Sequence, residues 1–352
     1  MDFTFTEDQL LFQESVRDFL INEVTPERIR ASWQSDTGRE DQLWQQLTEL
    51  GLVGMTVPEE HGGLGMNEVD FILLAQECGY VALPEPLVHT ALVAVPLLRE
   101  LGEELDGELA AQWLPKIAAG QAKVLVGLEQ NLLVEDAHVA DLLLLQRGDA
   151  IYALTPEQVS LRHNESVDPS RRLYAVEIPA DAAPAVSGDI AVELSGKALN
   201  RGALGAAAQA LGLAQRMVDM SVQYTGERQQ FGKLIGSFQA VKHHMANVAV
   251  ALEYAKAPVH RAAYSIAMGE VRAGRTVSHA KLVACAAANL AAKNSVQVHG
   301  AMGYTWEVDL HIFMKKAWAL ANTWGDAGYH KTRVAQYIFS DDAQLGAVGT
   351  FS

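Results

Sequence analysis

Cysteine is scarce in this 352-residue chain, which contains only Cys78 and Cys285. Both lie in apolar surroundings of helical character, and neither has a second cysteine at a CxxC spacing. The sequence therefore supports neither a disulfide framework nor a cysteine-based metal site. We expect two buried structural thiols and no bound metal.

Long apolar runs are also missing, since no stretch approaches the roughly 18 apolar residues that a membrane-spanning helix needs. The first residues, MDFTFTEDQ, lack the basic and apolar regions of a signal peptide. We therefore expect a cytoplasmic protein without a membrane span.

Positive charge is in short supply, because 27 lysines and arginines face 43 aspartates and glutamates, and the formal net charge is -16. Nucleic acid as the main partner would need a concentrated basic face, so this composition argues against it. A single polyanionic ligand, such as a dinucleotide or coenzyme A, needs only a few local cations. Arg228, Lys233 and Lys242 form a candidate set.

The pattern of apolar residues predicts helices in residues 1–120. Thr6 and Gln9 have the spacing of a capping box at the start of a first helix. Leu43, Leu47 and Leu50 repeat at helical spacing before a glycine that ends the second helix. Further helical patterns cover residues 68–78 and 89–101.

The pattern changes in residues 121–196, where short apolar runs alternate with polar turns. The runs VLVGLEQ, VADLLLLQRGD, AIYALTPEQVSL and RRLYAVEIP predict strands. Helical character returns from residue 199 to residue 339, within a C-terminal part that we place at 197–352. The predicted fold is mainly α, with a central β domain between two helical domains.

Residues 227–246, ERQQFGKLIGSFQAVKHHMA, combine an arginine, amides and an aromatic residue with a glycine turn before a long helix. Arginine can pair bidentately with a pyrophosphate, and an aromatic side chain can lie against a ring. The pattern therefore suggests a bound flavin nucleotide. Taken alone it is ambiguous, because a helix end with surface charge has the same composition.

This α, β, α order, together with the motifs PEEHGGLG, ERQQFGKLIGSFQAVKHHMA and VQVHGAMGYTWEVDLH, resembles the acyl-CoA dehydrogenase family from end to end. The resemblance implies a helical N-terminal domain, a small β domain and a C-terminal four-helix bundle that assembles into tetramers around bound FAD. It also implies dehydrogenation of an acyl-CoA to a trans-2-enoyl-CoA, with an electron-transferring flavoprotein as electron acceptor.

The same resemblance assigns candidate residues for FAD binding. Arg228, Gln230 and Phe231 match positions that reach the FAD of a neighbouring subunit, and Gln239 lies in the same patch. Gln297 and Gly300 match positions at the adenosine end of the flavin, where a glycine lets the backbone approach the ligand.

The catalytic glutamate of the family occupies one of two places, and both are empty in this sequence. Counting from Ala317 of MKKAW reaches Trp324, and counting back from Gln215 of GLAQR reaches Gly202. Neither an indole nor a glycine can act as a base. The segment at residues 127–130 also lacks the family's usual flavin- and thioester-binding pattern.

These departures resemble the short, base-less subunit of heteromeric α2β2 acyl-CoA dehydrogenases of bacterial steroid side-chain degradation. In that case a second dehydrogenase subunit provides the glutamate for a bulky, steroid-derived acyl-CoA. Two alternatives stay open. One is a self-sufficient homotetramer with a relocated base, such as Asp326, Glu307 or Asp309, and the other is a non-catalytic scaffold that retains an acyl-CoA or a flavin.

Overall fold

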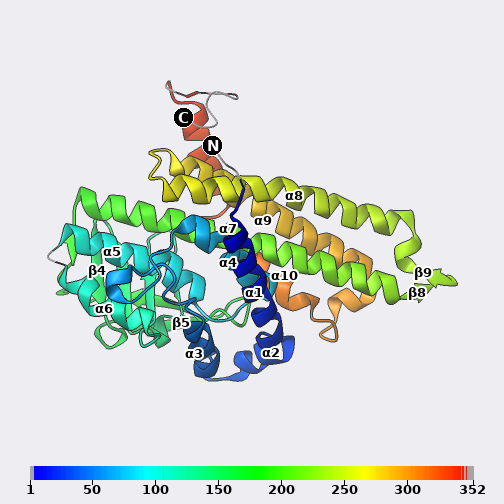
Figure 1. Ribbon diagram of the computed structural model, residues 1–352, viewed down its shortest axis with the longest axis horizontal. Coiled ribbons are helices and arrows are strands. Elements are labelled where there is room, and N and C mark those ends of the chain that lie inside the picture. The colour runs from blue at the N-terminus through cyan, green and yellow to red at the C-terminus, as the bar shows by residue number, and fades with distance from the viewer. Residues whose placement is uncertain (1–3, 106, 342, 345, 347–352) are drawn as a thin grey trace.

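The computed structural model describes residues 4–105, 107–341, 343, 344 and 346 (Figure 1). Within the described residues, helices form the N-terminal and C-terminal parts, and a β region lies between them in sequence. This confirms the predicted α, β, α order. The division at 1–120, 121–196 and 197–352 stays a prediction.

The N-terminal part consists of helices joined by short loops. The predicted capping box starts the first helix, since the Thr6 hydroxyl accepts the Gln9 N–H and the Gln9 side chain accepts the Thr6 N–H. Gly51 follows the third helix with φ +75°, a conformation that favours glycine. The α-helices are α1 (Glu7–Glu23), α2 (Pro26–Gln34), α3 (Asp41–Glu49), α4 (Glu68–Tyr80), α5 (Val95–Glu104) and α6 (Glu108–Ala118). A π-helix, His89–Ala94, leads into α5.

The β region contains two small sheets. Their strands are β1 (Val124–Gly127), β2 (Leu133–Glu135), β3 (Leu142–Arg147), β4 (Ala150–Leu154), β5 (Ser160–Asn164), β6 (Leu173–Glu177) and β7 (Val186–Ser187). One sheet has the order β1-β3-β4-β7 and the other β2-β6-β5. Strands β1 and β3 are parallel, and the other neighbours are antiparallel.

Side chains of β1 and β3 alternate between two cores. Val124 and Leu144 join the core that the helices share, whereas Leu125 and Leu143 pack with Val134 in a smaller core between the sheets. Because both faces of these strands are covered, the strands read as continuous apolar runs. This explains why LLLLQ was recognisable as a strand.

The C-terminal part is built around long helices: α7 (Asp189–Glu227), α8 (Gln239–Ala267), α9 (Ala273–His299), α10 (Leu310–Ala321) and α11 (Ala327–Ile338). The first of them starts at Asp189, ten residues before the predicted start near Leu199, and so crosses the proposed 196/197 boundary. Glycines let α4 lie against α7, because a Cβ at Gly212 would stand 1.9 Å from the Gln76 carbonyl oxygen.

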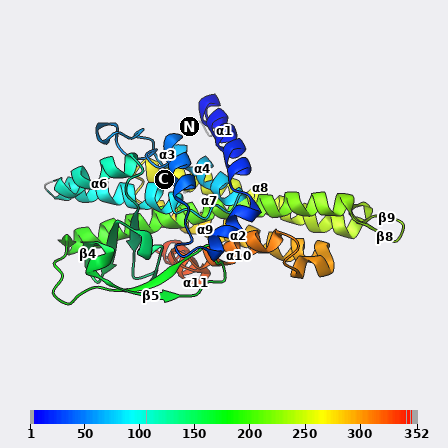
Figure 2. The same cartoon turned by 90° about the horizontal axis from the view of Figure 1, so that it is seen from below.

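Helices α7, α8 and α9 run along the long axis of the molecule in Figures 1 and 2. A short hairpin, β8 (Gln229–Gln230) and β9 (Lys233–Leu234), joins α7 to α8 at one end of this axis. Strands β4 and β5 lie toward the opposite end in both views. Among the residues described, no helix is both long and apolar enough to cross a bilayer.

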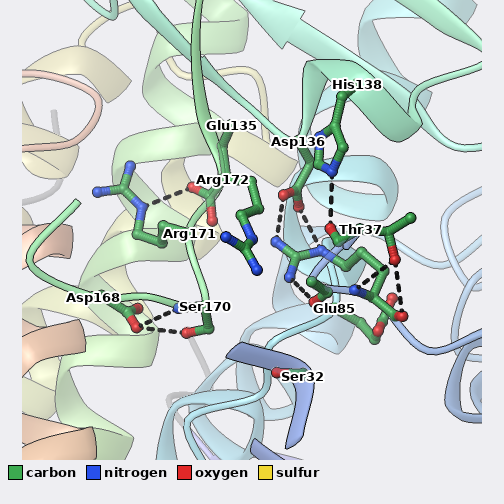
Figure 3. Close-up of polar contacts among 12 residues, drawn as sticks. Ser32, Thr37, Glu85, Glu135, Asp136, His138, Asp168, Ser170, Arg171 and Arg172 are labelled. Carbon is green, nitrogen blue, oxygen red and sulfur yellow. Dashed lines mark hydrogen bonds and ion pairs between the residues drawn. The ribbon is translucent and has the colours of Figure 1, made fainter. Parts of the chain in front are cut away.

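A buried polar cluster joins the N-terminal helices to the β region. The Arg39 guanidinium forms an ion pair with Asp136, whose carboxylate is fully buried. The His138 ring donates from Nε2 to the Thr37 carbonyl oxygen at 2.8 Å (Figure 3). On the β side, Arg171 pairs with Glu135 at 3.0 Å. These contacts fix the position of β2 against the helices.

Candidate functional site

The two positions that would hold a catalytic glutamate meet in the interior. Gly202 lies in α7, and Trp324 lies in the turn between α10 and α11. A Cβ atom built on Gly202 would stand 2.2 Å from Cδ2 of the Trp324 indole. The indole therefore occupies the space in front of Gly202, and only glycine fits beneath it.

Polar contacts hold the Trp324 backbone in place, although its φ of +57° is unfavourable for a bulky residue. Its N–H donates to Oδ1 of Asn131 at 2.9 Å, and its carbonyl oxygen accepts from Nε2 of His330 at 3.0 Å. The His89 ring packs edge-on against the indole, with 5.1 Å between ring centroids. The indole is thus fixed by contacts on several sides.

Only about 50 Å³ of cavity remains beside the indole. Small-molecule sites in proteins are usually about 300–1,000 Å³. The cavity has no room for an acyl chain or for a flavin ring system. Its lining includes Glu85, His89, Glu135 and Lys316 besides Trp324 and Gly202.

Two of the lining residues are carboxylic acids that the sequence analysis did not single out. Burial raises the pKa of Glu85, and its Oε1 accepts the Glu40 N–H at 2.9 Å. Burial alone would also raise the pKa of Glu135, but the positive charges of Arg171, Lys316 and Arg39 together outweigh it and hold that pKa well below its usual value. Glu85 is therefore the better proton acceptor of the two. In the sequence, the feature that sets Glu85 apart is its place between two prolines.

The three acids considered from the sequence have other surroundings. Asp326 is exposed and caps α11 by accepting the Tyr329 N–H at 2.8 Å. Asp309 forms an ion pair with Arg30. Glu307 is exposed. None of the three lines the small cavity beside Trp324.

The predicted flavin-binding patch forms the β8–β9 hairpin. Phe231 and Gly232 occupy its two-residue turn with φ values of +56° and +74°, as a type I′ turn requires. The turn leaves Phe231 89% exposed. Arg228 and Gln230 are exposed beside it, and no residue that the structure describes forms an ion pair with Arg228. The hairpin thus presents an unpaired guanidinium next to an open aromatic ring.

The C-terminal end of α9 lies against the base of the hairpin. Tyr224, near the end of α7, stacks on His299 with 4.3 Å between ring centroids. His244 of α8 donates from Nδ1 to Oδ1 of Asn294 at 2.5 Å. His299 is buried and donates from Nδ1 to the Ser295 carbonyl oxygen.

All six candidate flavin-binding residues are therefore exposed at the same end of the bundle. They are Arg228, Gln230, Phe231, Gln239, Gln297 and Gly300. Gly300 ends α9 with φ +60° and ψ -135°, a region that is essentially restricted to glycine. A Cβ there would meet no heavy atom within 4 Å, so the backbone at this point is open to a ligand.

These residues fit the nucleotide half of FAD. The arginine suits a pyrophosphate, the amides can reach ribose or adenine, and Gly300 lets the backbone approach. The interior around Trp324 does not fit the ring half of the cofactor, because the indole fills it. The two halves of a flavin site are thus unequally retained in this chain.

Comparisons with known proteins identify the family of the chain. Residues 6–121 match the family profile of the acyl-CoA dehydrogenase N-terminal domain, and residues 192–339 match that of its C-terminal domain. The protein named acyl-CoA dehydrogenase IpdE2 of Mycobacterium tuberculosis is 30% identical over 316 residues, which are 88% of this chain and 91% of that protein.

Two solved structures share the fold. The ChsE4-ChsE5 complex from Mycobacterium tuberculosis gives a TM-score of 0.83 at 21% identity, covering 99% of this chain and 100% of the matched one. A variant of the Tcur3481-Tcur3483 steroid ACAD gives 0.82 at 22% identity, with 94% and 97% covered. With profiles matched in both helical parts and a relative aligned over most of its length, the chain belongs to the acyl-CoA dehydrogenase family of FAD-dependent oxidoreductases.

Proposed function

We propose that this chain is the base-less subunit of a heteromeric, FAD-dependent acyl-CoA dehydrogenase. The observation that carries the proposal is the Trp324 indole packed on Gly202, because it fills both places where the family's base would stand. In this proposal a second dehydrogenase subunit provides the glutamate, and the two chains form an α2β2 assembly.

The reaction explains why the missing base matters. A carboxylate must remove the α-proton of the acyl-CoA, and FAD, when bound, accepts the hydride from the β-carbon. An indole cannot accept a proton at ordinary pH. The contribution of this chain is then to bind and orient: Arg228 holds the pyrophosphate, Gln230, Gln239 and Gln297 hold further polar atoms, and Phe231 covers a ring.

The position of the hairpin supports sharing between chains. The β8–β9 hairpin, which begins directly after Arg228, lies at the end of the α7–α8 pair, whereas β4 and β5 of the same chain lie toward the opposite end (Figure 1). A ligand gripped by the exposed hairpin is therefore free to extend into the active site of another subunit. Electrons would leave that site through an electron-transferring flavoprotein.

The substrate that we propose is a bulky, steroid-derived acyl-CoA. Support comes from the proteins that share the fold, which include the ChsE4-ChsE5 complex and a protein described as a steroid ACAD. The small cavity beside Trp324 also agrees, because it is too small to hold an acyl chain and so cannot set a chain-length preference at that place.

Co-expression tests the proposal. The candidate partner is a second dehydrogenase-like chain, encoded next to this one, that has a glutamate at one of the two places. We expect little FAD and no turnover from this chain alone, and both from the mixed assembly. Replacing the partner's glutamate by glutamine should abolish turnover and leave the FAD content unchanged. Full FAD occupancy and acyl-CoA-dependent bleaching of this chain alone would contradict the proposal.

A second candidate function rests on Glu85. Glu85 lines the cavity beside Trp324, and burial raises the pKa of its carboxyl, as a general base in a self-sufficient homotetramer would need. This function requires the indole to move out of the cavity. If it holds, Glu85→Gln abolishes turnover of the chain purified alone, whereas Glu307→Gln and Asp326→Asn do not. A chain that is inactive alone with a panel of acyl-CoAs contradicts it.

A further inference from the structure

A lysine and a cysteine that the proposed function does not use lie side by side on α9. Nζ of Lys281 is 3.5 Å from Sγ of Cys285, one helical turn away. Both side chains are buried, with 2% and 8% of the residues exposed. Both nevertheless line a cavity of about 640 Å³ between α9, α10 and α11.

The cavity has an apolar wall and a polar rim. Val283 and Ala286 contribute to the wall, together with the partly exposed ring of Trp318. Lys331 and Asn322 stand exposed at the rim, so the cavity opens to the surface. Its size is within the range of about 300–1,000 Å³ that is usual for small-molecule sites.

Burial and the neighbouring thiol act on the Lys281 amine in opposite directions. Burial lowers its pKa, because the ammonium loses its hydration, and Cys285 opposes this shift without cancelling it. Its Nζ also donates to the carbonyl oxygen of Leu320 at the end of α10. A neutral amine next to a thiol can take the thiol proton and so generate the more reactive thiolate.

We propose that Cys285 and Lys281 form an acyl-accepting pair, which takes an acyl group from an acyl thioester bound in this cavity. The thioester class rests on the proposed function, in which acyl-CoA is the substrate. The apolar wall suits the acyl group, and the Lys331 cation at the rim suits the phosphates of a coenzyme A thioester.

The transfer takes two balanced steps without an oxidant. First, the Cys285 sulfur attacks the thioester carbonyl carbon, the bond to coenzyme A breaks, and coenzyme A leaves as a thiol with the proton that Lys281 took from Cys285. Second, the Lys281 nitrogen attacks the new thioester, the C–S bond breaks, and one amine proton returns to Cys285. The product is an amide on Lys281. Proximity drives the second step, because both groups are held on adjacent turns of one helix.

The chain contains a matched control for each group. Lys316 is also buried and also donates to a carbonyl oxygen, that of Leu83 at 2.7 Å, but no thiol of the described residues lies within bonding distance of it. Cys78 is fully buried, burial raises the pKa of its thiol, and it lines none of the described cavities. If burial alone decided reactivity, these residues would behave as Lys281 and Cys285 do.

The test incubates the full-length chain with octanoyl-CoA and follows the peptides by mass spectrometry. We expect a hydroxylamine-sensitive adduct on Cys285 at early times and a resistant adduct on Lys281 later, with none on Cys78 or Lys316. Cys285→Ala should slow acylation of Lys281 by about tenfold or more. Lys281→Arg keeps the donor to Leu320 but can neither take the thiol proton nor accept the acyl group, so Cys285 should be acylated more slowly and its acyl group should stay there. Circular dichroism confirms that both variants fold.

Two results would overturn the proposal: no adduct on either residue of the pair, or acylation of Lys281 at the same rate in the Cys285→Ala variant. These outcomes are separate from those of the proposed function. The co-expression experiment measures FAD content and turnover, whereas acylation of the pair is measured on this chain without flavin or partner.

Discussion

The indole of Trp324 lies against the backbone of Gly202, so closely that one methyl group on Gly202 would stand 2.2 Å from the ring. Each residue alone explains the loss of one possible base. Together they explain why the cavity is closed, because the side chain at one position occupies the space left by the missing side chain at the other.

Removing the indole should open a cavity and destabilise the fold. Trp324→Ala deletes a side chain that is 6% exposed, and large core truncations of this kind cost about 3–5 kcal/mol of unfolding free energy. Added indole should raise the melting temperature of this variant by filling the cavity, and should not affect the unsubstituted chain. Trp306→Ala is the control, because Trp306 is 66% exposed. An equal loss of unfolding free energy in both variants would show that the Trp324 indole does not fill a buried space.

The contact also predicts a reversal of sign in a double-mutant cycle. Gly202→Ala alone should destabilise the chain by about 1–3 kcal/mol, because the new methyl group collides with the indole. In the Trp324→Ala background the collision disappears, and alanine in a helix interior is preferred over glycine by about 1 kcal/mol. Urea denaturation of the four proteins measures the coupling. Simple additivity would show that the two residues do not restrict each other.

Local chemistry decided which parts of the fold could be predicted. The capping box at Thr6 and Gln9 and the turn at Gly51 depend on a few neighbouring residues, and the structure has both. The start of α7 was predicted too late. Gly188 precedes the helix, and residues 189–198 contain no proline and only one glycine, so nothing stops the helix from extending back to Asp189.

The interior site was harder to predict, because its contacts join distant segments. Counting along the sequence placed Trp324 and Gly202 at the two base positions, but it gave no sign that one side chain lies on the other. Glu85 was missed for the same reason, since only the folded chain brings it to the cavity. The exposed hairpin, in contrast, is a continuous segment and was recognisable as a motif.

The unfolding free energy should decrease in acid, because His330 holds the turn that contains Trp324. Burial lowers the pKa of His330 to about 4, so its neutral ring donates from Nε2 to Trp324 and accepts the Ser278 hydroxyl at Nδ1. Lys281 and Arg333 also lower this pKa, and Asp326 opposes them. An unfolded histidine has a pKa of about 6.5. Between pH 6.5 and 4 the unfolded chain therefore binds a proton that the folded chain does not. The unfolding free energy thus decreases as the pH is lowered through this range.

His330→Gln should weaken this acid sensitivity, because an amide can keep both hydrogen bonds without titrating. Denaturation at pH 7.5 and pH 5 measures the difference. Part of the loss should persist, because burial also lowers the pKa of His89 and His260 to about 4. His243→Gln, at an exposed position, is the control. An unchanged loss in the His330→Gln variant would remove this residue from the account.

Arg228 should affect flavin content and leave folding intact. Its side chain is exposed at the hairpin, so Arg228→Ala should change the unfolding free energy very little. A charged hydrogen bond to a phosphate contributes about 1.5–3 kcal/mol, which predicts roughly tenfold to hundredfold weaker FAD binding in the mixed assembly. Arg228→Lys should restore only part of it, because lysine cannot form the bidentate pair. The control is Arg99→Ala, which removes another exposed arginine and should leave FAD binding unchanged.

FAD titration of the reconstituted assemblies measures these affinities. An unchanged affinity in the Arg228→Ala assembly would show that the hairpin does not bind the partner's cofactor.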